Sequence, residues 1–381
     1  MNILFAIKAL DNVQGGAERV LADITSGLAD KGHNISILSF DKSGGQSFYP
    51  LNEKVKRIAL GIGDVTRNAR FHEVIARMVA IRKTTVKARP DAVIAFMHST
   101  FIPASFALIG TGIPVIASEH IVPEHYKNKR WEYILLLLSH FFVKKITVLS
   151  QTIIKSYSSI LHPKMVAIEN PVHPAQALAN TQRNKTDKKI ILNVGRLTPQ
   201  KDQETLINAF KKISNDHPEW HLKIIGEGEL RENLEKQIQE LNLESRVSLP
   251  GITSDIEHEY QNAHIFALSS KYESFGLVTA EAMAHRLPAI GFASCPGTNE
   301  IINNKINGLL VDGSDKIEAF AQGLKQLIEN EELRKSLGEA GLKSVEKFHP
   351  DIIVEKWENL IKDAIQAPEK TKHSKLGDVK S

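Results

Sequence analysis

Short apolar runs alternate with amphipathic stretches along almost the whole chain. Asn2–Lys8, for example, has the length and apolar content of a buried strand, and residues 16–30 carry apolar side chains at helical spacing. Repeated alternation of this kind predicts parallel sheets with helices on both faces. Strands are predicted at 2–8, 35–40, 55–60, 92–96, 114–118, 145–149, 165–169, 189–195, 221–225, near 247 and 265, and at 288–291 and 308–311. Helices are predicted at 16–30, 71–87, 131–142, 203–213, 230–241, after 275, and in three terminal segments that end near 366.

A polar, proline-punctuated segment divides this pattern into two halves. Residues 171–188 read PVHPAQALANTQRNKTDK, which is typical of a linker between domains. A chain of 381 residues is too long for one core, so we expect one domain at 1–170 and another at 189–349. Two doubly wound halves would place a ligand-binding cleft between the carboxyl ends of their sheets. The polar residues 367–381 lack apolar anchors and are predicted to be a disordered tail.

The composition is that of a soluble globular protein, with 42% hydrophobic and 24% charged residues. A single cysteine, Cys295, excludes an internal disulfide framework and a cysteine-based metal cluster, and it fits a reducing cytosol. The first residues, MNILFAIKAL, contain too short an apolar run for a signal peptide and are better explained as a first strand. We therefore expect a cytoplasmic protein.

The charge of the chain is unevenly distributed. Residues 1–180 contain 21 Lys and Arg against 13 Asp and Glu, a net charge of +8, which leaves −4 for the remainder of a chain whose total is +4. A basic first half suggests a partner that is anionic, such as lipid head groups or a phosphorylated acceptor. Nucleic acid is not expected, because no basic-aromatic motif accompanies the charge.

The stretch from Lys271 to Arg286 reads KYESFGLVTAEAMAHR and combines a glycine-containing loop with an apolar helix. Gly276 allows backbone N–H groups to come close to an anion where the helix begins, which suits a diphosphate. With a helix that begins near Phe275, Glu281 lies about two turns in, and Glu273 precedes the first turn. Carboxylates accept hydrogen bonds from vicinal hydroxyls, as in a sugar or a ribose. On spacing alone, helix capping and solubility explain the two acids equally well.

Two other predicted strand ends in the first half carry candidate residues. Gly15 and Gly16 open a helix after the first strand, so their backbone can approach a phosphate or a sugar, although a tight turn also explains them. After the strand at 114–118, His120 is expected to point towards the cleft and to hydrogen-bond a sugar hydroxyl or a developing charge. A structural histidine is an equally good explanation.

The second half contributes cations and a glycine pair. Arg196 and Lys201 follow the strand at 189–195 and would bind a diphosphate whose bridging oxygen gains charge as it leaves. An exposed basic turn is the alternative. Gly226, in the sequence Gly-Glu-Gly, leaves room for a flat base or a ribose after the strand at 221–225.

Taken in order, the motifs GGAER, SEH, NVGRLTPQKD, GEGEL and ESFGLVTAE resemble those of the retaining glycosyltransferases of family 4, the "glycosyl transferases group 1". The resemblance spans Asn2 to about Gln366. It implies an α/β GT-B fold, in which two doubly wound Rossmann-like domains face each other across a cleft. It also implies that the terminal helix, 350–366, crosses back onto the first domain near Trp357.

The resemblance also implies individual roles. Arg196 and Lys201 would bind the donor diphosphate and stabilise it as it leaves, Glu281 would hold the ribose hydroxyls, and Glu273 would contact the donor sugar. His120 would touch the sugar near its reacting face, and Gly16 would approach the donor phosphate or the acceptor. Backbone groups of Phe275, Gly276 and Leu277 would help Glu273 to contact the donor sugar.

A retaining enzyme of this family needs no carboxylate nucleophile, because the acceptor attacks the face that the diphosphate vacates. No Asp-x-Asp motif occurs in the chain. We therefore expect neither a metal nor another cofactor, since cations and helix N-termini would neutralise the diphosphate.

The segment 127–145 allows two interpretations. The continuous apolar run 134–138 is far too short to span a bilayer, which takes about 20 residues. The helix at 131–143 is either buried against the sheet or docked on anionic lipid through its basic edge, which includes Trp131.

Together these features predict a hexosyl- or N-acetylhexosaminyltransferase that forms an α-linkage. The donor would be a UDP-sugar, with a GDP-sugar as the competing possibility, and the acceptor a polyprenyl-diphosphate-linked glycan or a similar polysaccharide. The enzyme would be peripheral on the cytoplasmic face of a bacterial inner membrane. The alternatives are a UDP-sugar 2-epimerase of the same architecture, which would need further acids and histidines beside His120, and a non-catalytic nucleotide-sugar-binding protein.

Overall fold

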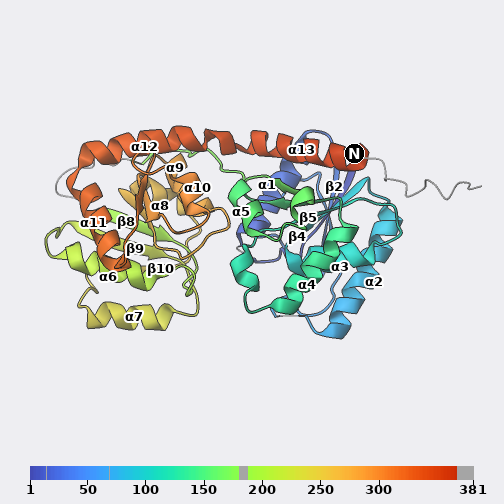
Figure 1. Ribbon diagram of the computed structural model, residues 1–381, viewed down its shortest axis with the longest axis horizontal. Helices are drawn as coiled ribbons and strands as arrows, with labels where there is room; N and C mark the ends of the chain where they lie inside the picture. The colour runs from blue at the N-terminus through green and yellow to red at the C-terminus, as the bar shows by residue number, and fades with distance from the viewer. Residues whose placement is uncertain (14, 68, 180–187, 367–381) are drawn as a thin grey trace, which may run out of the picture.

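The computed structural model describes residues 1–13, 15–67, 69–179 and 188–366. It contains two sheets, each flanked by helices, which define a first and a second lobe (Figure 1). The first sheet has the strand order β3-β2-β1-β4-β5-β6-β7, and the second has the order β10-β9-β8-β11-β12-β13. All pairings between these strands are parallel. The predicted α/β class with two doubly wound halves is confirmed.

The first lobe is built on apolar strands that are buried on both faces; every residue of β4, for instance, is buried. Its strands are β1 (Asn2–Ala6), β2 (Asn34–Ser39), β3 (Lys56–Ala59), β4 (Ala92–Phe96), β5 (Val115–Ser118), β6 (Lys145–Val148) and β7 (Met165–Ala167). Its helices are α1 (Gly16–Asp30), α2 (Phe71–Ala88), α3 (His98–Ala107), η1 (Pro123–Tyr126), α4 (Arg130–Ser139), η2 (His140–Phe142), α5 (Gln151–Ser156) and η3 (His162–Lys164).

The second lobe repeats the strand-helix alternation. Its strands are β8 (Lys189–Val194), β9 (Trp220–Ile225), β10 (Val247–Gly251), β11 (Ile265–Leu268), β12 (Ala289–Phe292) and β13 (Leu309–Val311). Its helices are α6 (Gln203–Ser214), α7 (Arg231–Glu240), α8 (Ile256–Asn262), α9 (Leu277–Ala284), α10 (Thr298–Ile301), α11 (Lys316–Glu329), α12 (Glu331–Val345) and η4 (Glu346–Phe348), after which α13 (Pro350–Gln366) follows.

Helix α13 leaves the second lobe and lies along the first, where it packs on α1 (Figure 1). Its Trp357 stacks on Phe96 of β4, with ring centroids 5.9 Å apart. Gly27 of α1 lies so close to Val354 that an added Cβ would come within 2.6 Å of a methyl carbon. The last helix is therefore part of the first lobe's core, and the chain connects the lobes twice.

The first connection between the lobes is only partly described. The amide of Val172 donates to the carbonyl of Phe348 at 2.8 Å, and that of Ala179 donates to His285 at 2.9 Å. These bonds hold 172–179 along the second lobe and η4. The remainder of the predicted linker, and the predicted disordered tail at 367–381, lie outside the described residues.

Among the α-helices of the described residues, four were not predicted from the sequence: α3, α5, α8 and the four-residue α10. Helix α3 contains Pro103 and has apolar residues on every side, so it lacks the periodicity that marks a surface helix. Helices α5 and α8 have only six and seven residues, too few for a recognisable pattern. No helix in the described part of the chain has both the length and the apolar content needed to cross a bilayer.

Candidate active site

The loops after β8 and β11 lie side by side because these two strands are neighbours in the second sheet. The amide of Lys271 donates to the carbonyl of Gln200 at 2.9 Å, and the Gln200 side chain donates to the carbonyl of Tyr272 at 2.9 Å. The hydroxyl of Ser269 donates to the carbonyl of Lys201 at 3.0 Å. Residues about 70 positions apart are thereby brought to one sheet edge.

Lys201 and Glu273 form an ion pair across these loops. The Lys201 Nζ lies 2.6 Å from Glu273 Oε1, and both side chains are largely buried. Neither charge would be tolerated alone at this depth, because a buried unpaired charge is costly. In the structure Lys201 and Glu273 are therefore each other's partner. The prediction from the sequence was that Lys201 would bind the diphosphate and that Glu273 would contact the sugar.

Gly276 sits at the start of α9 in a left-handed conformation, with a φ of 84°. A side chain would be strained there, and this explains the glycine. The helix begins at Leu277, so the expectation of a start near Phe275 is wrong. Glu281 consequently lies a little over one turn into the helix and not two.

Glu281 is one of the residues through which the two lobes touch. It is buried, accepts a hydrogen bond from the hydroxyl of Tyr260 at 3.0 Å, and forms an ion pair with Arg19 of α1 in the first lobe. Burial raises the pKa of Glu281, and the nearby Arg19 partly offsets this rise. Arg19 was placed at a helix start from the sequence but was not predicted to be a site residue. Its position in the first turn after Gly15 and Gly16 was the available signal.

Arg196 is exposed at the mouth of β8, opposite the start of α1. Burial raises the pKa of Glu18 in α1, and the positive charge of Arg196 partly offsets that rise. A cation from the second lobe and an acid from the first therefore influence each other across the same region.

Gly226 has a packing explanation. An added Cβ would come within 2.0 Å of the carbonyl oxygen of Gly195, and at Gly228 it would meet the carbonyl of Leu197 at 2.3 Å. The loops after β8 and β9 thus touch backbone to backbone, and the amide of Leu197 donates to Glu227. Room for a base beside Gly226 stays a prediction.

His120 follows β5 and is packed inside the first lobe. Its Nε2 lies 2.9 Å from the hydroxyl oxygen of Ser118, and its ring stacks on Phe96 with centroids 5.0 Å apart. This burial lowers the pKa of His120 from 6.5 to about 4, so the ring is neutral at pH 7. A neutral imidazole can position a hydroxyl but cannot supply positive charge.

We expect the folded-state titration of His120 to have its midpoint near pH 4. Because the folded ring binds its proton less readily, its contribution to stability is complete above pH 6.5 and is lost as the pH falls towards 4. Burial raises the pKa of the neighbouring Glu119 to about 7, so its contribution to stability is present at low pH and is lost as the pH rises towards 7. Because thermal unfolding would report both effects together, the titration should be followed by NMR of the imidazole protons. The His120 signal is assigned by its absence in the His120→Asn variant. A midpoint at or above 6 would contradict the burial seen here.

A cluster of polar side chains that follows β4 and β5 was not predicted from the sequence. Within the described ranges, the ligand atoms of His98, His125 and Glu132 lie within 4.8 Å of one another, as a metal site would require. The ammonium of Lys129, however, lies 3.0 Å from His125 Nε2 and 3.6 Å from Glu132, so it already supplies a cation to this group. His98, His125 and Glu132 come from α3, η1 and α4, and Lys129 directly precedes α4.

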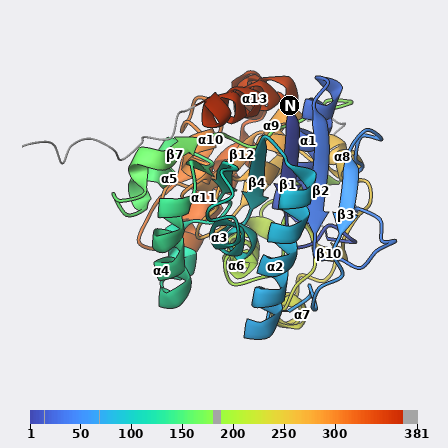
Figure 2. The same cartoon turned by 90° about the vertical axis from the view of Figure 1, so that its right-hand side faces the viewer.

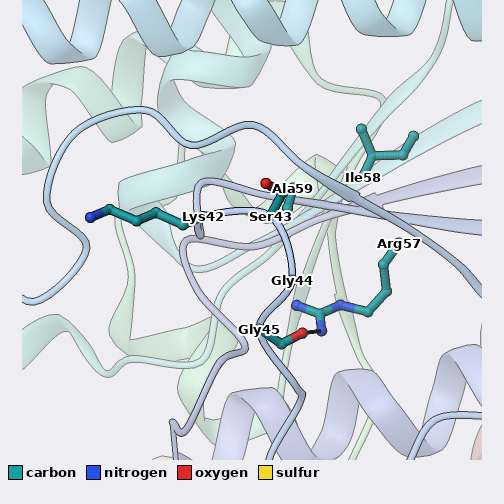
Figure 3. Close-up of a pocket in the computed structure, with 7 residues that line it drawn as sticks. All are labelled: Lys42, Ser43, Gly44, Gly45, Arg57, Ile58 and Ala59. Atoms are coloured by element: carbon teal, nitrogen blue, oxygen red, sulfur yellow. Dashed lines mark hydrogen bonds between the residues drawn. The ribbon is translucent and has the colours of Figure 1, made fainter.

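A pocket of about 440 Å³ opens beside β2 and β3 (Figure 3). The guanidinium of Arg57 donates to the carbonyl of Gly45 at 2.7 Å on one side of it. The pocket is lined by Lys42, Ser43, Gly44, Gly45, Arg57, Ile58 and Ala59. None of the predicted site residues lines it.

With this geometry established, two family models account for most of the chain. The model described as "Glycosyltransferase Family 4" matches residues 14–176, and "Glycosyl transferases group 1" matches residues 176–344. The chain belongs to the group 1 glycosyltransferases. The junction between the two matches falls in the segment predicted to link the domains.

Full-length relatives of this glycosyltransferase occur in bacterial polysaccharide pathways. It is 28% identical over 371 residues, 96% of its length, to the whole of a Campylobacter jejuni protein named as an α-1,4-N-acetyl-D-galactosaminyltransferase for a PP-undecaprenol-linked substrate. It is 26% identical over 366 residues to the amylovoran biosynthesis glycosyltransferase AmsD of Erwinia amylovora, covering 94% of this chain and 99% of that one.

Solved structures support the GT-B fold. Sucrose-phosphate synthase from Thermosynechococcus elongatus superimposes with a TM-score of 0.83 at 19% identity, covering 95% of this glycosyltransferase and 98% of that chain. Anabaena HepE, solved with UDP and glucose, gives a TM-score of 0.76 at 18% identity and covers 95% and 99%. The predicted GT-B architecture is confirmed.

Proposed function

We propose that this glycosyltransferase moves a hexose or N-acetylhexosamine from a nucleotide diphosphate sugar to a lipid-linked or polysaccharide acceptor, with retention and formation of an α-bond. The observation that carries the proposal is the group of two cations and two acids, Arg196, Lys201, Glu273 and Glu281, at the strand ends of the second lobe. The names of several relatives agree, including the N-acetylgalactosaminyltransferase above and a Staphylococcus aureus poly(ribitol-phosphate) α-N-acetylglucosaminyltransferase.

In the proposed reaction, the bond between the anomeric carbon and the diphosphate oxygen breaks as the acceptor oxygen bonds to that carbon from the same face. The acceptor's proton passes to the departing diphosphate. Arg196 and Lys201 stabilise the charge that develops on the leaving oxygen. Glu273 and Glu281 hold hydroxyls of the sugar and the ribose on either side.

Donor binding then requires an exchange of partners. In the structure Lys201 is paired with Glu273 and Arg19 with Glu281. A diphosphate offers Lys201 a stronger, doubly charged partner, which frees Glu273 for the sugar hydroxyls. Ribose hydroxyls would likewise take the place of Arg19 at Glu281.

A thermal-shift screen against UDP- and GDP-sugars tests the donor assignment. We expect UDP-sugars to raise the melting temperature by several degrees, because a ligand at about 100 times its Kd stabilises the folded form by about 2.7 kcal/mol. A larger shift with GDP-sugars would reassign the base, and no shift with either would refute the proposal. The anomeric coupling constant of the product, measured by proton NMR on a polyprenyl-diphosphate-linked sugar, would then test retention.

The 2-epimerase alternative gains one observation from the structure, because His98, His125 and Glu132 add to the acids and histidines beside His120. They lie in the first lobe, however, whereas the predicted donor-binding cations and acids lie in the second. Incubation with a UDP-N-acetylhexosamine and no acceptor separates the two functions, since only an epimerase would convert the donor to its 2-epimer.

We also propose that α4 and η2 dock on an anionic membrane surface at the cytoplasmic side. The apolar residues of α4 are mostly not buried against the sheet: Leu136 is the one that is fully buried, and Trp131 is 79% exposed. Of the two interpretations of this segment, burial against the sheet therefore describes only part of α4. Lys127, Lys129 and Arg130 precede the exposed residues and suit anionic head groups.

A further inference from the structure

Helix α2 has large apolar residues on its exposed side and buries two charged residues on its inner side, which is unusual for a surface helix. Phe71 and Val79 are 83% and 61% exposed, and such large apolar side chains are normally turned inward. The buried residues of α2 are Glu73, Arg77, Ile81 and Thr85. The exposed apolar residues are Phe71, Ile75, Val79 and Val86.

The polar residues on the inner side are held by specific partners. Glu73 accepts hydrogen bonds from the guanidinium of Arg67 at 2.7 and 2.9 Å and from the amide of Arg70 at 2.6 Å. Arg77 donates to the carbonyl of Ile62 at 3.2 Å, and its guanidinium lies 4.6 Å from the centre of the Phe40 ring. These bonds fix the orientation of α2, so its apolar stripe is turned outward by the fold and not by chance.

The exposed face of α2 carries only positive charge. Its charged residues are Arg82, Lys83 and Lys87, and the exposed residues Arg70 and Arg89 flank the helix. The one acid of the helix, Glu73, is buried. A face that combines apolar side chains with cations alone complements an anionic surface.

Helix α4 also combines exposed apolar side chains with a basic start at Arg130, although it contains one acid, Glu132. Helices α2 and α4 both contact α3, and they lie on either side of it (Figure 2). Ile109, just after α3, is also exposed, and Arg82 of α2 donates to its carbonyl at 2.9 Å. The exposed apolar residues of α4 and η2 are Trp131, Ile134, Leu135, Leu138, Phe141 and Phe142.

We infer that α2 is a second membrane-docking helix, which together with α4 and η2 forms one two-helix face for an anionic lipid surface. This inference rests on the membrane docking of α4 proposed above. The stripe from Phe71 to Val86 is about 22 Å long at 1.5 Å per residue. Phe71, Ile75 and Val79 stand one turn apart, and Val86 follows two turns later. The exposed cations Arg82, Lys83 and Lys87 lie in the second half of the helix, where long stems of this kind can follow apolar side chains into the head-group region. Two helices on either side of α3 fix the tilt of the first lobe, which a single helix would leave free to rotate.

Flotation of the full chain with vesicles tests this face. The probes are phosphatidylglycerol vesicles and neutral phosphatidylcholine vesicles. We expect Ile75→Gln combined with Val79→Gln to lower the fraction bound to anionic vesicles at least fivefold, and Lys83→Gln combined with Lys87→Gln to lower it similarly in low salt. The matched control is Ile306→Gln, which removes a side chain that is 68% exposed on the second lobe and should bind as the wild type does.

The remaining outcomes separate this inference from the docking of α4. If Leu135→Gln abolishes flotation and the α2 variants float normally, α4 docks alone and the inference about α2 fails. If the wild type is a dimer by analytical ultracentrifugation and the α2 variants are monomers, a second copy covers this face and the inference is again overturned. Donor-induced thermal shifts should be unchanged in every α2 variant, so failure of the donor assignment would be seen independently.

Discussion

Replacing Lys201 with alanine is expected to lower the rate of sugar transfer by about 30- to 1000-fold, which corresponds to the roughly 2–4 kcal/mol lost with one charged transition-state contact. The Lys201 ammonium is held at the end of β8 by its 2.6 Å contact with Glu273, so it is already placed beside the acid that is proposed to hold the donor sugar. The effect should fall mainly on kcat, because the leaving diphosphate gains charge only as the bond breaks. Initial rates at saturating donor are the measurement.

The neighbouring cation Lys271 provides the control for this experiment. Its side chain is half exposed in the β11 loop and lies 3.9 Å from Asp202, so Lys271→Ala removes an equal charge without touching the ion pair. Lys201→Ala also leaves Glu273 without its cation, and for that reason melting temperatures must be recorded beside the rates. Turnover within twofold of the wild type in a folded Lys201→Ala protein would remove Lys201 from the proposed role.

Glu281→Ala should chiefly weaken nucleotide binding, by about 10- to 100-fold, since a hydrogen bond to a charged group contributes roughly 1.5–3 kcal/mol. Calorimetric titration with the nucleotide diphosphate that the thermal-shift screen selects would measure the loss. The turnover of enzyme saturated with donor should fall less than its affinity. Wild-type affinity in the variant would refute the ribose assignment.

Arg19→Ala is the informative companion variant. In the structure Arg19, which belongs to the opposite lobe, forms an ion pair with the carboxylate of Glu281. If ribose hydroxyls displace it, removing Arg19 should not weaken nucleotide binding, because the competitor is gone. An equal loss of affinity in both variants would mean that the ion pair, and not Glu281 alone, builds the site.

The loops predicted to bind the donor were located correctly at strand ends, but their local geometry was not predictable in detail. Gly276 was assigned to close backbone approach, whereas its left-handed conformation ends the loop and delays the helix to Leu277. At Gly226 a side chain would meet the carbonyl of Gly195, a contact that the sequence did not predict. The sequence marked both glycines, but the backbone conformation of Gly276 and the neighbour of Gly226 came only from the structure.

The amino-acid sequence was enough to predict the alternation of strands and helices, the two-lobe organisation and the position of the loops that carry the candidate site residues. These features are encoded locally, since periodicity, turn residues and motif order all lie within short windows. The partner of each charge, by contrast, depends on contacts between distant segments of the folded chain. Lys201 and Glu273 are 72 residues apart, and Arg19 and Glu281 are 262 apart. The tertiary structure also decided which sides of α2 and α4 face outward, because the outward side of a helix is set by what packs on its other side.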